Sequence, residues 1–187
     1  MKKKILLFAF WFSVISIASS AQSFPDPEFS SRPYSLEADT ALKNLERADA
    51  QVDFKLKGLG YGGSETYFTT FTPKSGIRFL KNTLPKLIIK VDGNIDPSEL
   101  ISLSKAEVKK DRRKFLQSSI ALGGGARDVS NTFLKIQFKK LREGIYEIIL
   151  PKDIQPGEYG FIPMNTGTGN PLTSFNAKAK ITCFGID

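Results

Sequence analysis

Carboxylates are the side chains of this sequence best suited to acid–base chemistry, because its 187 residues contain no histidine. The lack of imidazole excludes Ser–His–Asp and Cys–His activation of a nucleophile, and it excludes histidine ligation of a metal. One cysteine, Cys183, is too few for zinc or iron–sulfur sites of ordinary type. A pair of acids of the glycosidase kind stays open, although the sequence does not set the distance between them. The acids considered for such a pair are Glu65, Asp92, Glu99, Asp128 and Glu158.

Three segments superficially resemble ion or phosphate sites. Residues 92–96 (DGNID) place oxygen side chains at alternate positions, as an EF-hand calcium loop does at its start. The rest of that loop does not fit, because Pro97 stands where glycine is needed and Leu103 where a bidentate glutamate is needed. The glycine-rich segments 58–63 and 123–127 lack the lysine and the Ser/Thr of a P-loop. We therefore interpret all three as turns and predict no metal and no cofactor.

The N-terminus carries an export pattern. Lys2, Lys3 and Lys4 precede the uncharged, apolar run 5–18, which is shorter than the ~20 residues that a spanning helix needs. Small residues at 19–21 predict signal peptide cleavage after Ala21, with a retained anchor as the alternative. We expect an exported protein, periplasmic or extracellular, with a signal peptide at 1–21.

Basic residues are most densely clustered just before and at the start of the predicted strand 113–122. The basic residues are Lys109, Lys110, Arg112, Arg113 and Lys114, with Asp111 as the one acid among them. They follow the apolar run 99–108 and lead into 113–122, so we expect them at the tip of a hairpin, where long side chains could contact a polyanion. For an exported protein, anionic glycans or lipid headgroups are more sensible partners than nucleic acid. The alternative is a charged tip that prevents edge pairing and keeps the protein soluble.

Aromatic side chains could also bind a ligand. Tyr61, Tyr67, Phe68 and Phe71 could stack on sugars, but fifteen phenylalanines in the chain favour a role in the core. Cys183 lies in the apolar run ITCF, which indicates a buried, inert thiol.

Short apolar runs separated by Gly, Pro, Asn and Asp predict the elements that position these residues. Residues 48–57 alternate strictly and 65–71 are rich in β-branched and aromatic residues, which is typical of strands, whereas 39–47 could be a short helix or a strand. Further strands are expected at 76–80, 84–91, 99–108, 113–122, 132–138, 145–150, 158–163 and 175–185. Three prolines and four serines make 22–37 an expected extended lead-in. The sequence therefore predicts one all-β domain, 38–187, an immunoglobulin-like antiparallel sandwich of about nine or ten strands.

A turn before one of these strands resembles the tyrosine corner of immunoglobulin-like sandwiches. Pro156 presets φ, Gly157 permits positive φ, and Tyr159 opens the next strand with a hydroxyl that can bond to backbone a few residues upstream. The motif is therefore expected to be architectural.

Several segments extend the resemblance beyond the corner. The segments LERADAQVDFKLKGLGYGG, KSGIRF, NIDPSELISLSKAEVKKDRR, GIYEIILP and the terminal CFGID together resemble exported, functionally uncharacterised proteins of Bacteroidota-type bacteria. The resemblance covers almost all of the chain after the signal peptide. It implies a secreted β-sandwich and brings no activity or catalytic residue.

These observations lead to one expected function and one alternative. We expect a non-catalytic exported β-sandwich that acts as an interaction or structural module of the envelope or cell surface. The alternative is a glycan-binding or glycan-processing protein that uses aromatic and carboxylate side chains on its surface. Its partner would be an anionic glycan, a lipid surface or another envelope protein, and we expect no nucleic acid.

Overall fold

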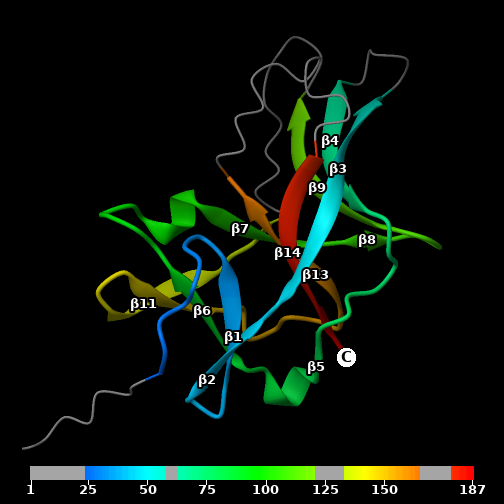
Figure 1. Ribbon diagram of the computed structural model, residues 1–187. Helices are drawn as coiled ribbons and strands as arrows, with labels where there is room; N and C mark the ends of the chain where they lie inside the picture. Colours follow the sequence, from blue (N-terminus) through cyan, green and yellow to red (C-terminus); the bar gives the residue numbers. More distant parts are fainter. Residues whose placement is uncertain (1–23, 58–62, 121–132, 165–177) are drawn as a thin grey trace, which may run out of the picture.

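The computed structural model describes residues 24–57, 63–120, 133–164 and 178–187 (Figure 1). Strands make up 58% of these residues, and no α-helix occurs among them. Antiparallel sheets pack together, so the predicted all-β sandwich is confirmed. The predicted signal peptide, 1–21, lies outside the described residues, as do most of 58–63 and all of 123–127.

The described part of the chain forms fourteen strands and two short 3₁₀ helices. In chain order they are β1 (Pro33–Glu37), β2 (Ala41–Asn44), β3 (Glu46–Leu56), β4 (Ser64–Thr70), β5 (Arg78–Phe79), η2 (Lys81–Thr83), β6 (Lys86–Lys90), η3 (Pro97–Glu99), β7 (Ile101–Lys105), β8 (Glu107–Val108), β9 (Arg113–Ile120), β10 (Phe133–Leu134), β11 (Gln137–Arg142), β12 (Ile145–Ile149), β13 (Gly157–Pro163) and β14 (Lys178–Ile186).

Two sheets contain these strands. One has five strands in the order β11-β12-β6-β1-β2, and the other follows the path β10-β7-β13-β14-β3-β4-β9-β8, with β5 parallel to the end of β14. In Figure 1, β3, β4 and β9 extend upward, away from the smaller sheet at lower left. The strand count exceeds the predicted nine or ten, partly because 99–108 breaks into β7 and β8 and 132–138 spans β10 and the start of β11.

The larger sheet curls back on itself. β7 pairs with β13 at one end of the strand order and β8 pairs with β9 at the other, yet only Ala106 separates β7 from β8 in the chain. The Ala106 amide donates to the Glu158 carbonyl, which keeps this segment against β13. Gly160 on β13 has the Phe115 ring of β9 against it, because a Cβ added there would lie 2.8 Å from that ring. The curl encloses a second apolar cluster, of which Phe68 and Phe115 are fully buried members.

The main core lies between the two sheets. Leu87, Ile89 and Ile148 enter it from the smaller sheet, and Leu103, Phe161 and Phe184 from the larger one. Leu45 separates β2 from β3 in the chain, and here the chain crosses from the smaller sheet to the larger one. Its side chain is buried in the same core. Segment 39–47 is therefore a turn, a strand and this crossing, and not the short helix that was the alternative.

The expected lead-in, 22–37, is wrong in its second half. β1 lies inside the smaller sheet and pairs with both β2 and β6. Pro33 is tolerated because it is the first residue of the strand. Tyr34, Ser35 and Leu36 are buried, so burial and pairing on both sides outweigh the Pro- and Ser-rich composition.

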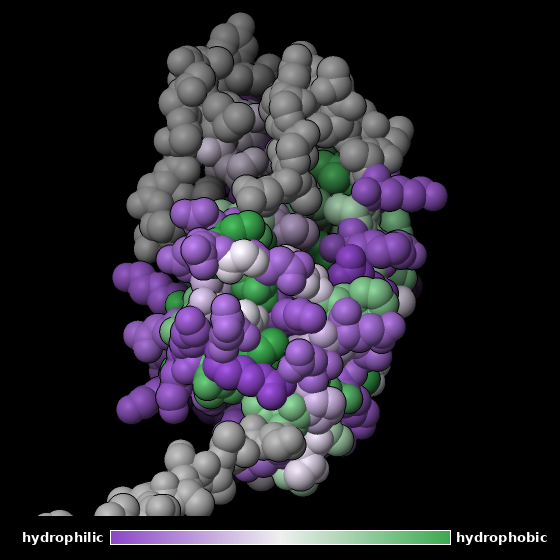
Figure 2. Space-filling model, turned by 60° about the vertical axis from the view of Figure 1, so that its left-hand side comes forward, coloured by the Kyte–Doolittle hydropathy of each residue, from purple (hydrophilic) through white to green (hydrophobic). Residues whose placement is uncertain are grey.

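The residues before β1, 24–32, form a strap over the outer face of the smaller sheet. Phe24 packs there with Leu36, Ile88 and Ile145, which face away from the main core. Arg142 at the end of β11 holds the strap: it bonds to the Phe24 carbonyl, pairs with Asp26, and lies 4.7 Å from the centre of the Phe24 ring. Figure 2 views the molecule with the β11 side nearer the reader, and small apolar areas are separated there by hydrophilic side chains.

Candidate functional site

The predicted tyrosine corner has the expected geometry. The Tyr159 ring is fully buried and stacks on Phe184, with 5.5 Å between the ring centres. Its hydroxyl donates to the Gln155 carbonyl, four residues upstream, which is the bond that the motif predicts. Burial raises the pKa of this hydroxyl, so it stays protonated at neutral pH. Tyr159 therefore serves as a structural hydrogen-bond donor.

Gly157 has a backbone conformation that favours glycine, and the end of a lysine side chain lies beside it. Its φ is +154°, and a Cβ added there would lie 2.7 Å from Cε of Lys105. Lys105 pairs in register with Tyr159, and its Nζ lies 5.8 Å from the centre of that ring. The corner thus places an exposed ammonium at the edge of the main core.

The predicted hairpin is present in a shortened form. Only β8 and β9 form it, and the Lys109 amide donates to the Arg112 carbonyl across its tip. Acids neutralise two of the cations there, since Lys109 pairs with Glu107 and Arg112 with Asp111. Lys110 is exposed at the tip.

Lys114 and Arg113 lie beyond the tip, on opposite faces of β9. Nζ of Lys114 is 3.7 Å from the Asp53 carboxylate, on the outer face. Arg113 was predicted to contact a polyanion, and this prediction is wrong because its side chain is fully buried. Successive side chains of a strand point to opposite faces, so Arg113 shares the inward face with Phe115.

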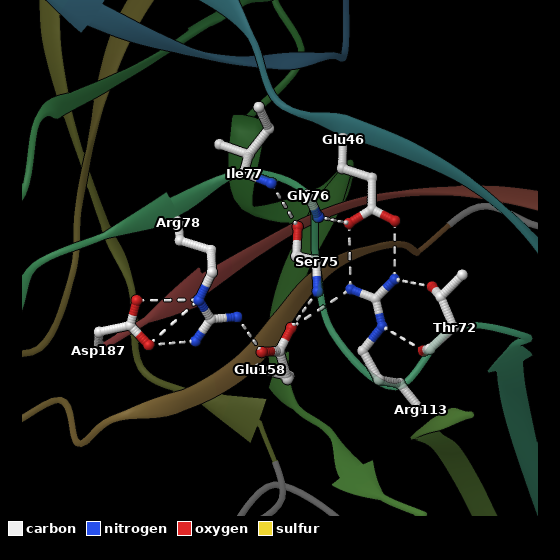
Figure 3. A network of polar contacts seen from close by, with 9 residues as sticks. All are labelled: Glu46, Thr72, Ser75, Gly76, Ile77, Arg78, Arg113, Glu158 and Asp187. Atoms are coloured by element: carbon white, nitrogen blue, oxygen red, sulfur yellow. Dashed lines mark hydrogen bonds and ion pairs between the residues drawn. The ribbon is translucent and has the colours of Figure 1, made fainter. Parts of the chain in front are cut away.

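Arg113 is the centre of a buried polar network that sequence reasoning missed (Figure 3). Its Nη2 lies 2.8 Å from Glu46 and its Nη1 3.5 Å from Glu158. Its Nε donates to the Thr72 carbonyl at 3.0 Å, and its Nη2 also donates to the Thr72 hydroxyl at 2.9 Å. Five donors in a planar fork suit this arrangement, which an ammonium could not reproduce.

Arg78 extends the network to the last strand. Its Nη1 lies 2.5 Å from the second oxygen of Glu158, and its Nε and Nη2 donate to Asp187. The Ser75 amide also donates to Glu158, at 2.7 Å. The network therefore joins β3, the 72–78 segment, β9, β13 and the end of β14, which lie far apart in sequence.

The electrostatics of the network lower the pKa values of two of its acids, Glu46 and Asp187. Burial alone would raise the pKa of Glu46, but hydrogen bonds from Arg113 and Ser75 outweigh it, and the pKa lies below its ordinary value of 4.5. Hydrogen bonds from Arg78 lower the pKa of Asp187 from 3.8 in the same way. An ionised, doubly held carboxylate is a poor proton donor at neutral pH, so the network suits structural use.

Of the other acids considered for a catalytic pair, the three that the structure describes, Glu65, Asp92 and Glu99, take no part in this network. Glu65 bonds to Lys57 and to the Tyr67 hydroxyl, and these bonds lower its pKa despite burial. Asp92 and Glu99 are exposed, and Asp128 lies outside the described residues. Within the described ranges, no group of three or more Cys, Asp or Glu could hold a metal. In segment 92–96, Asp96 caps η3 by accepting from the Ser98 amide at 2.8 Å.

The predicted aromatic residues divide between core and surface. Phe68 is fully buried, while Tyr61 lies outside the described residues. Tyr67 and Phe71 lie on the outer face of β3, β4 and β9, where Phe71 is 59% exposed. Lys114 lies 5.7 Å from the Tyr67 ring centre and Arg112 lies 5.9 Å from that of Phe71.

Beside Phe71 is a hollow of about 500 Å³. Its described lining residues are Asp49, Ala50, Gln51, Phe71 and Lys178.

A second hollow lies under the tyrosine corner, at the mouth of the main core. Its volume is about 450 Å³. Its described lining residues are Lys105, Phe133, Leu134, Lys135, Pro151, Asp153, Ile154, Gln155 and Tyr159. Sequence reasoning missed this site because its residues come from β7, β10, β13 and the segment after β12, and the one motif among them, the tyrosine corner, predicted only a structural role.

Comparison with known proteins adds no relative to this picture. No family model, curated protein or solved structure matches the chain. In the part of the chain that the structure describes, no helix is long and apolar enough to cross a membrane.

Proposed function

We propose that this chain is a non-catalytic exported β-sandwich that acts as an interaction or structural module of the cell envelope or cell surface. Export rests on the pattern of lysines, apolar run and small residues at 1–21. One observation supports the non-catalytic part: each buried carboxylate in the described residues is held by cationic or hydroxyl donors. Glu158 is bonded by Arg78 and Arg113, and Glu65 by Lys57 and Tyr67.

This observation bears on catalysis because a carboxyl group that acts as a general acid needs a raised pKa. A carboxylate that acts as a nucleophile needs an oxygen that is open to the substrate. Three donors, two on one oxygen of Glu158 and one on the other, engage most of the lone pairs with which this carboxylate would attack a substrate or accept a proton. Burial raises the pKa of the Cys183 thiol to about 12, so little thiolate is present to act as a nucleophile.

Cell fractionation and a substrate screen test this proposal together. We expect the protein in the envelope or medium of the host, with an N-terminus at Gln22 in the mature form. Purified protein is then assayed against chromogenic glycosides, esters and peptides. Recovery of uncleaved protein in the cytoplasm would contradict export. Turnover that disappears in the Glu158→Gln or Glu65→Gln variant, while Glu99→Gln retains it, would contradict the non-catalytic role.

Glycan binding is the second candidate, because Phe71 exposes 59% of its surface beside a hollow with acid, amide and ammonium groups. Aromatic rings stack on sugar faces, and polar groups around them bond to hydroxyls. Arg112 already lies over the Phe71 ring, so a sugar would have to use its other face or displace Arg112. Glycan-array binding that falls at least tenfold in Phe71→Ala, and stays unchanged in Leu80→Ala at another exposed apolar residue, would support this candidate.

A further inference from the structure

The hollow under the tyrosine corner has an apolar floor that continues into the main core. Leu134 packs against the core cluster that also contains Ile154 and Tyr159, and all three residues line the hollow. Phe133 and Pro151 add apolar wall. The volume of about 450 Å³ falls within the ~300–1,000 Å³ that is typical of small-molecule pockets.

Two lysines stand at this apolar surface without an acidic partner. Lys105 and Lys135 form no ion pair with any other residue that the structure describes. Both are exposed, so each ammonium is open to water and to a ligand. The hairpin cations differ, since Lys109, Arg112 and Lys114 each have a carboxylate within 4 Å. Among the described hairpin cations only Lys110 is exposed without an ion pair, whereas two such lysines line one apolar hollow at the corner.

One of these lysines lies against the corner itself. The end of the Lys105 side chain lies beside the backbone of Gly157, and its Nζ lies 5.8 Å from the centre of the buried Tyr159 ring. Its ammonium is therefore both exposed and in cation–π contact with an aromatic ring of the core. The rim also carries one acid, Asp153, whose carbonyl accepts from the Gln155 side chain at 2.7 Å.

From this juxtaposition we propose that the corner hollow binds an amphipathic anion, with the apolar body against Phe133, Leu134 and Pro151 and the anionic head between Lys105 and Lys135. The inference deepens the proposed function by naming a ligand class, and it rests on the non-catalytic binding role. A free fatty carboxylate and the acyl chain and head of an anionic lipid share this chemistry.

Equilibrium binding to the purified protein tests the site. The probe is 8-anilino-1-naphthalenesulfonate, an apolar anion whose fluorescence rises in apolar surroundings, and the competitor is dodecanoate. We expect saturable 1:1 binding, competition by dodecanoate, none by dodecyltrimethylammonium, and weakening as salt is raised. Lys105→Gln and Lys135→Gln should each weaken binding by up to about fivefold, because exposed ion pairs are individually weak. Asp153→Asn should strengthen it.

A matched control and a membrane arm complete the experiment. Lys110→Gln removes an exposed lysine at the hairpin tip and should leave the affinity unchanged. Vesicles of phosphatidylglycerol, compared with phosphatidylcholine, distinguish the sources: vesicle binding lost in the double lysine variant identifies a lipid ligand, and dodecanoate binding alone identifies a free one. Absence of binding in both arms, or binding that the double variant retains, would overturn the proposal. Chemical conversion of a bound anion would instead overturn the non-catalytic role and leave the site standing.

Discussion

Replacing Arg113 by methionine is the sharpest test of the buried network. Methionine keeps much of the apolar stem and removes the guanidinium, so it deletes five hydrogen bonds: two to Thr72, two to Glu46 and one to Glu158. The two carboxylates then stay close together without the cation between them. Removing one partner of a buried ion pair costs about 3–5 kcal/mol because it leaves uncompensated charge.

The remaining partners place the expected cost at the lower end of that range. Glu158 keeps Arg78 at 2.5 Å and the Ser75 amide at 2.7 Å. Glu46 keeps the Gly76 amide at 3.2 Å, and its side chain is 21% exposed, so water can reach it. We therefore expect a loss of about 3 kcal/mol in the free energy of unfolding. In a domain of this size, that loss lowers Tm by about 6–12 °C.

Urea and thermal unfolding followed by circular dichroism measure this loss, and Arg112→Met is the matched control. Arg112 is adjacent in sequence, and its contacts among the described residues are at the surface: an ion pair with the exposed Asp111 and a cation–π contact with the exposed Phe71 ring. Its replacement should therefore cost about 0.5 kcal/mol. Arg113→Lys keeps the charge but not the fork, so its stability should fall between wild type and Arg113→Met. Equal stability of Arg112→Met and Arg113→Met would refute the reasoning.

Four further predictions concern the tyrosine corner, the N-terminal strap, two carboxylates with lowered pKa values, and Cys183. Tyr159→Phe removes the bond to the Gln155 carbonyl and should cost about 0.5–1.5 kcal/mol, measured by thermal melting; an unchanged Tm would contradict a structural corner. Phe24→Ala should cost about 2–4 kcal/mol and expose the strap to proteolysis, whereas Phe29→Ala, half exposed in the same strap, should cost under 1 kcal/mol. Glu46 and Glu65 have folded-state pKa values below the ordinary 4.5, so their contribution to stability is complete above about pH 4.5 and is lost as pH falls through the lowered values. Urea midpoints between pH 7 and pH 3 check the sign, and a midpoint that rises toward pH 3 would contradict it. Cys183, buried and with its pKa raised to about 12, should resist alkylation by iodoacetamide at pH 8 in the native protein and react in urea; rapid native labelling would contradict its burial.

Local patterns predicted those parts of the molecule that depend on neighbours in sequence. Alternation in 48–57 and β-branched residues in 65–71 predicted β3 and β4, because a strand with one buried face needs that periodicity. The Pro156–Tyr159 turn predicted the hydroxyl bond to Gln155, since both partners lie within five residues. The alternation of Arg113 and Phe115 could also have placed Arg113 on an inward face, had it been weighed against the charge cluster around it.

Composition alone settled one matter of chemistry, because a chain without histidine cannot use imidazole in any fold. Tertiary structure decided what lies at long range. Arg113 meets Glu46 and Glu158 only because the larger sheet curls until β9, the start of β3 and β13 surround one space, and no local pattern encodes that closure. β1 lies in a sheet because it pairs with β6, about fifty residues later in the chain, and packs with its apolar side chains. This pairing and burial outweigh the effect of the prolines and serines around β1. Burial and ion pairing between distant strands arise only when the sheets pack. The sequence therefore predicted most strands, whereas the tertiary structure decided which of their charged side chains face inward.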